Sequence, residues 1–181
     1  MALVLNGQAN TIGGLAVGGL PDGSIATADL ASGVGGKILQ ILQTTTDSTV
    51  TNETTSFVDT NLTGNITPAS TSNKILIIIS QTVQWKKSGS DAGGNIKLLR
   101  GSTSLNAILP SQNNGLYSYI SGTSQTNNYN VYNLTYLDSP STTSAITYKT
   151  QCASHYADDS AQFKCQAESG KSFLTLIEVA G

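Results

Sequence analysis

The chain has 181 residues, enough for one domain with a sizeable core, but only 11% of them are charged, against about 25% in a typical soluble domain. A formal net charge of −2 argues against the clustered Lys and Arg that bind a phosphate backbone, so we expect no nucleic-acid partner. No apolar run approaches the roughly 20 residues of a membrane span, and the N-terminus lacks the basic flank and apolar core of a signal peptide, so we expect no membrane insertion.

Residues 1–36 are rich in Gly and Ala, and paired glycines interrupt any long helix or strand. A single helical turn is expected between Ser24 and Ser32. The segment cannot build a core of its own, yet it holds too many apolar residues to be left in water. We therefore predict an extended N-terminal arm that docks on copies of the chain or on a larger assembly. The anchoring candidates are Leu3, Leu5, Ile12, Leu15 and Leu20.

From residue 37 onward, short runs of Val, Ile, Leu, Tyr and Thr alternate with Gly, Ser and Asn turns. These runs are typical of strands, and the turns at 101–104, 138–141 and 168–171 suit tight connections between antiparallel strands. About eight to ten strands is the size of a two-sheet sandwich. The sequence therefore predicts an all-β fold, an antiparallel, jelly-roll-like β-sandwich head over residues 37–181. The expected strands are 37–44, 56–58, 64–67, 74–85, 95–100, 105–109, 116–120, 129–137, 145–150, 161–166 and 172–179.

Two of these strands carry apolar bulk on both faces. In 129–137, Tyr129, Val131 and Leu137 lie on one face and Tyr132, Leu134 and Tyr136 on the other, because successive side chains alternate across a sheet. In 172–179, Phe173 and Ile177 oppose Leu174 and Leu176. Strands of this kind are covered on both sides. We expect the opposite sheet on one side and a neighbouring copy of the chain on the other.

The two cysteines, Cys152 and Cys165, offer no metal-ligand spacing. They could form a disulfide if they lie on adjacent strands of a hairpin. The alternative is a pair of reduced, half-buried thiols, as a reducing cytosol would maintain. No other residue pattern indicates a metal or a cofactor, so we expect neither.

Nucleophilic catalysis has one candidate centre, because His155 is the single histidine and lies near Cys152, Asp158 and Asp159. These residues fall in a polar connection in which Asp and Ser are ordinary turn residues. The sequence therefore favours a protein that is not an enzyme. A pair of convergent carboxylates, as in a small glycan depolymerase, stays a distant alternative.

A binding surface is expected in the long polar connections 86–94, 110–115 and 121–128, because rigid sandwiches present their variable contacts in end loops. Ser, Asn, Gln and Gly there could pair with sugar hydroxyls, and nearby aromatic rings could stack on a sugar. Solvated turns and core packing are the alternatives. The candidate contacts to a host surface glycan are Trp85, Tyr117, Tyr119, Asn113 and Asn127.

Several segments resemble a known family. Residues 19–33, followed by 37–43, resemble the stretch that leads into the head domain of many bacteriophage fibre and spike proteins. Later segments are similar to the order of strands in those heads, and the resemblance covers nearly the whole chain. These segments are 56–60, 66–79, 98–103 and 173–179.

The resemblance implies a homotrimer with a compact head, similar to the jelly roll of tumour necrosis factor, and an arm that holds it to the virion. Such a protein is made in the bacterial cytoplasm and ends on the virion surface, with other tail or capsid proteins as partners. Family members serve as tail fibres that touch the host or as head decorations. This chain has no extended shaft of repeats, which leaves both locations open.

Overall fold

The computed structural model describes residues 4–6, 11–13, 37–89, 91–105, 116–119, 125–157 and 160–181. The chain divides into two units, Met1–Lys37 and Ile38–Gly181, and each is described by itself. In the first unit, β1 (Val4–Asn6) and β2 (Thr11–Gly13) form an antiparallel hairpin that places Leu5 opposite Ile12. The composition of the arm had not indicated these strands. The helical turn expected near Ser24, and Leu3, Leu15 and Leu20, lie outside the described residues.

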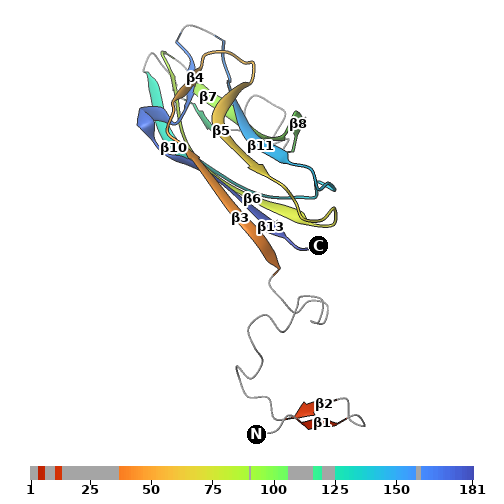
Figure 1. Ribbon diagram of the computed structural model, residues 1–181. Helices are drawn as coiled ribbons and strands as arrows, with labels where there is room; N and C mark the ends of the chain where they lie inside the picture. Colours follow the sequence, from red (N-terminus) through yellow and green to blue (C-terminus); the bar gives the residue numbers. More distant parts are fainter. Residues whose placement is uncertain are drawn as a thin grey trace. The chain divides into compact units, whose positions relative to one another are not determined.

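The second unit is an antiparallel β-sandwich, as the sequence predicts (Figure 1). Its larger sheet contains six described strands and the smaller sheet five. The larger is built from β3 (Ile38–Thr46), β4 (Val50–Asn52), β6 (Lys74–Lys87), β10 (Thr126–Asp138), β12 (Gln162–Cys165) and β13 (Ser172–Val179). The smaller is built from β5 (Val58–Ile66), β7 (Ala92–Arg100), β8 (Thr103–Ser104), β9 (Leu116–Ser118) and β11 (Ile146–Ser154).

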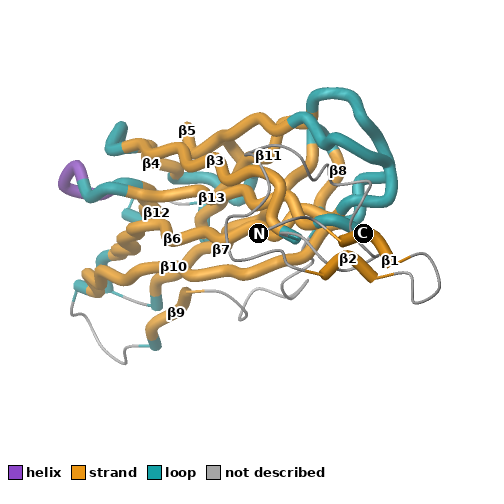
Figure 2. Tube along the Cα trace, turned by 60° about the horizontal axis from the view of Figure 1, so that its bottom comes forward, coloured by secondary structure: helices purple, strands orange, loops and turns teal. Residues whose placement is uncertain are grey.

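Strand β6 organises the larger sheet. On one side β10 pairs with it from Ile75 to Lys87, and on the other side β12 and β13 follow each other along the same edge (Figure 2). A short 3-10 turn, Ala167–Ser169, separates those two strands, with Gln166 in the left-handed region at φ 54°. The tight connection predicted at 168–171 therefore joins two collinear strands of one sheet. The prediction that it links antiparallel neighbours was wrong.

The core consists of two apolar clusters. The first packs Leu62, Ile77, Tyr148 and Leu174 with their neighbours, and the second packs Val83, Trp85 and Phe163 around both cysteines. Along β6 the inward side chains run from Ile79 in the first cluster to Val83 in the second, and buried Gln81 lies between them. A polar layer therefore divides the two halves of the core.

Every side chain of this polar layer finds a partner. The hydroxyl of Thr150 donates to Gln81 Oε1 at 3.0 Å and is hydrogen-bonded to the hydroxyl of Thr60. With the amide of Gln166 oriented to match its neighbours, its nitrogen donates to the carbonyl of Thr60 at 3.1 Å and its oxygen accepts from Gln81 Nε2 at 3.0 Å. A buried polar group costs free energy unless it is hydrogen-bonded, so a shift in strand register would be penalised here.

The two sheets approach closely at Gly94, where a Cβ would lie 2.1 Å from Phe163 Cδ2 in the opposite sheet. We expect Gly94→Ala to lower the free energy of unfolding by about 2–3 kcal/mol, because Phe163 is fully buried and cannot move aside. Gly64→Ala is the matched control, since its nearest atoms belong to the side chains of Leu174, Thr44 and Leu176 at 3.2–3.4 Å. Urea unfolding measures both, and equal losses would contradict the account.

Candidate functional site

Part of the outer face of the six-stranded sheet carries exposed apolar side chains. The register places Leu137, Leu76, Ile177 and Ile41 in one row across four strands. Ile41 is 58% exposed and Leu137 52%. Contiguous apolar surface of this kind marks an interaction site.

The next rows extend this face without a charged side chain. Thr135, Ile78, Thr175 and Gln43 form one row, and Phe173 lies in the following row between Ser80 and Thr45. Further along β10, Val131 and Tyr129 point the same way and are more than two-fifths exposed. We call this surface, from the row of Leu137 to the row of Phe173 with Val131 and Tyr129, the apolar face.

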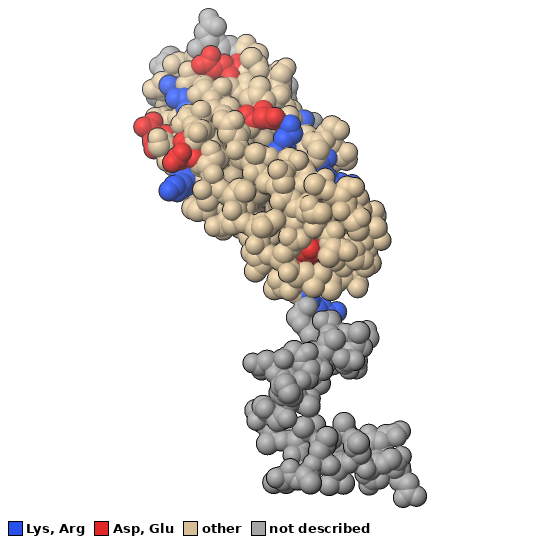
Figure 3. Space-filling view, in the orientation of Figure 1, with Lys and Arg blue, Asp and Glu red and all other residues tan. Residues whose placement is uncertain are grey.

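The outer face of the five-stranded sheet has the opposite character. Asp59 on β5 forms an ion pair with Lys149 on β11 at 2.8 Å and accepts a hydrogen bond from Gln151 Nε2. The hydrogen bond from Lys149 keeps the pKa of Asp59 below its usual range despite partial burial. Figure 3 shows charged side chains gathered in the upper part of the second unit and few in its lower part. The outer face of the five-stranded sheet thus carries an ion pair, whereas the apolar face carries no charged side chain.

Some of the predicted glycan contacts lie near the C-terminal end of β6, at the end of the sandwich opposite to Ile38. The Trp85 indole is 5% exposed and donates to Ser118 Oγ at 3.0 Å. Its ring therefore packs inside the sandwich beneath this end. The Tyr117 hydroxyl donates to Asp91, which raises the pKa of Tyr117, while Tyr119 is 74% exposed.

The two asparagines predicted as glycan contacts have different outcomes. Asn127 lies on β10 and accepts a hydrogen bond from Gln84 Nε2 at 2.8 Å, whereas Asn113 lies outside the described residues. Glycan contact by all five predicted residues therefore stays a prediction, although the Trp85 ring is buried. Of the three aromatic candidates, Tyr119 is the most exposed.

His155 is buried beside this end. Its ring centroid lies 5.9 Å from that of Tyr117 and 6.4 Å from that of Tyr156, and both ring nitrogens are buried without a hydrogen-bond partner in the described part of the chain. Burial lowers the pKa of His155, so the ring is neutral at physiological pH. No nucleophile or orienting acid contacts it there. Asp158 and Asp159 are outside the described residues.

Cys152 and Cys165 lie on strands of different sheets and meet inside the second core cluster. They are therefore not on adjacent strands of a hairpin, the arrangement expected for a disulfide, and the thiols are fully buried rather than half-buried. Both are free. The hydrogen bond with Cys152, together with burial, raises the pKa of Cys165, so Cys165 is not an activated nucleophile. Of the two alternatives that the sequence leaves open, a disulfide and two reduced thiols, the structure has the unbonded thiols.

Within the described ranges, no three His, Cys, Asp or Glu side chains gather as metal ligands. The same ranges contain no helix long and apolar enough to cross a membrane.

The buried imidazole predicts how stability depends on pH. The unfolded chain binds a proton at His155 near pH 6.5 and the folded chain only at lower pH, so the free energy of unfolding is highest above about pH 6.5 and falls as the pH drops, by at most about 1.4 kcal/mol per pH unit. His155→Phe replaces the imidazole by an apolar ring that cannot bind a proton. We expect a flatter profile for this variant between about pH 5.5 and 7 in urea unfolding. Identical slopes in both proteins would contradict the assignment.

No protein-family model matches the chain, and no curated protein matches it. Among solved structures, a protein of the Gx strain of infectious bursal disease virus matches 80% of the chain at 14% identity with a TM-score of 0.36. A protein from the crystal structure of the viral particle of the same virus matches 84% at 13% identity with a TM-score of 0.35. The chain spans about two-fifths of the length of these proteins, 39% and 40%. Likeness at these scores assigns no function.

Proposed function

We propose that the chain is a non-enzymatic structural protein of a phage virion, a homotrimeric tail-fibre or receptor-binding protein held to the particle by residues 1–36. The observation that carries self-assembly is the apolar face, which the other described residues of Ile38–Gly181 leave exposed. The phage assignment rests on the resemblance of the arm and of the strand order.

A second copy of the chain is the partner that best fits the apolar face. Leu76, Ile78 and Phe173 on one copy and the same residues on another can pack without desolvating a charge, whereas a charged partner would lose its hydration. Four strands about 4.8 Å apart and five residues of about 3.3 Å each give roughly 300 Å² in projection, to which Val131 and Tyr129 on β10 add. A standard interface buries about 800 Å² of accessible surface per partner, so the apolar face would form the centre of such an interface and its rim the rest.

The second unit has an attached end and a free end. Ile38, where the preceding segment joins, pairs with Val179, which in turn pairs with Lys74 at the start of β6. Tyr117 lies near the other end of β6, roughly 40 Å away for a strand of this length. Receptor contact, for example with a host surface glycan, belongs at the free end.

A capsid decoration protein is the second candidate. The resemblance on which the phage assignment rests includes head decorations as well as tail fibres. A cement protein would use the same trimeric head to clamp neighbouring coat subunits. Location in the particle separates the two functions, because self-assembly is common to both.

The self-association prediction is tested by placing a charge in the apolar face. We expect Ile78→Lys to weaken the oligomer at least about 100-fold, because three ammonium groups would be buried near one another. Thr63→Lys is the control, since Thr63 is exposed on the other sheet. Sedimentation velocity gives the mass and circular dichroism confirms the fold. Loss of the oligomer in neither variant, or in both, would contradict the proposal.

The location prediction uses the arm. We expect a chain lacking residues 1–36 to fold and assemble but to be missing from purified particles, because the second unit has its own core. Immunoelectron microscopy of particles with the full chain should label the tail. Label on the capsid shell would favour the decoration role, and truncated protein at normal occupancy would place the anchor elsewhere.

A further inference from the structure

A groove of about 560 Å³ crosses the outer face of the five-stranded sheet, away from the apolar face. It lies over β7, β11 and the turn after β7, where Gly101 has a φ of +58° and leaves open space. Its walls combine two ammonium groups, two hydroxyls, an amide and an apolar floor. The side chains concerned are Lys97, Lys149, Ser102, Thr147, Gln151 and Leu99.

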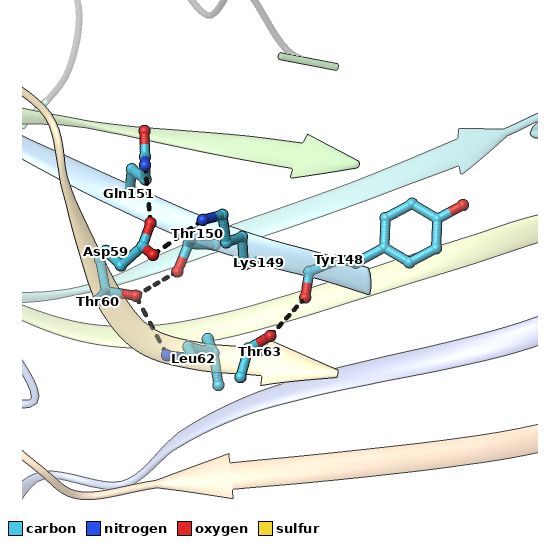
Figure 4. A network of polar contacts seen from close by, with 8 residues as sticks. All are labelled: Asp59, Thr60, Leu62, Thr63, Tyr148, Lys149, Thr150 and Gln151. Atoms are coloured by element: carbon cyan, nitrogen blue, oxygen red, sulfur yellow. Dashed lines mark hydrogen bonds and ion pairs between the residues drawn. The ribbon is translucent and has the colours of Figure 1, made fainter. Parts of the chain in front are cut away.

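The sheet register brings the charges of this groove together. Lys97 on β7 lies opposite Gln151 on β11, and Gln151 lies opposite Asp59 on β5, so the three share one row. Figure 4 shows Lys149 and Gln151 both directed to the carboxylate of Asp59. That carboxylate neutralises Lys149, and among the described residues Lys97 forms no ion pair.

Lys97 makes no ion pair with any residue that the structure describes. Its ammonium instead lies 4.1 Å from the centre of the Phe57 ring, and that ring is 38% exposed. The ammonium group can pair with the carboxylate of a ligand, and the exposed aromatic ring can stack on a sugar. The hydroxyl and amide groups of the groove can form hydrogen bonds with the same ligand.

We propose that this groove binds an acidic saccharide, with Lys97 opposite the carboxylate, Phe57 against a sugar ring and Gln151 with Thr147 at the hydroxyls. The groove is open and lies along a flat sheet, which suits a segment of a polymer better than a compact ligand that must be mostly enclosed. Nucleic acid fits poorly, because two lysines and one aspartate leave a single net positive charge. The site is on the sheet opposite the apolar face, so it does not depend on the proposed assembly.

Binding is tested by calorimetry on the full chain with oligogalacturonate at low salt. We expect this acidic oligosaccharide to bind and its methyl-esterified form, which keeps the sugars but not the charge, to bind at least about fivefold more weakly. Oligoglutamate supplies the carboxylates without sugar and should also bind more weakly. No binding of oligogalacturonate, or equal binding of either comparison ligand, would overturn the proposal.

Variants then place the site. Lys97→Ala should weaken binding about fivefold, and Asp59→Asn should tighten it, because Lys149 is released and a negative charge is removed. Lys74→Ala, an exposed lysine of the other sheet, is the matched control and should leave affinity unchanged. Circular dichroism confirms that each variant folds. An unchanged affinity in both Lys97→Ala and Asp59→Asn would place any binding outside this groove.

Discussion

The larger sheet carries apolar side chains on both faces, and the described residues of Ile38–Gly181 cover only those of the inner face. Inward side chains of β6, β10 and β13 pack against the smaller sheet, while Ile41, Ile78 and Leu137 on the outer side stay in contact with water. Full burial of a side chain of this size provides about 1.5–3 kcal/mol, and each of these partly exposed side chains forgoes a fraction of it. The exposure of these apolar side chains to water favours self-association, because association through the apolar face buries them.

Precise strand register is what makes that face continuous. The row of Leu76, Ile177 and Ile41 exists only because β6, β13 and β3 are aligned as they are, and a slip by one residue would exchange inner and outer side chains. The polar layer of Gln81 and Thr150 fixes this alignment from within the core. The same register assembles the groove at Lys97 on the other sheet. Both surfaces thus follow from one pattern of pairing.

Sequence patterns predicted the sandwich and its long strands, because alternation over 74–85 and 172–179 is clear. The sequence patterns predicted two short strands in place of β5, because Asn61 is a common turn residue. In the structure Asn61 has a φ of 63° inside the strand, and the pairing of β5 with β11 shifts register near Gln151. β4 was missed because its three residues depend on pairing with β12. The groove was missed because Lys97 and Lys149 are far apart in sequence. The burial of Trp85 could have been predicted, because alternation places it on the same face of β6 as Ile79 and Val83.

Native mass spectrometry of the wild-type chain at low micromolar concentration tests the central claim most directly. The apolar face should hold copies together at that concentration, because its association leaves no buried charge unpaired. The account predicts a species of three times the mass of the chain. A folded monomer that persists as the main species would contradict it.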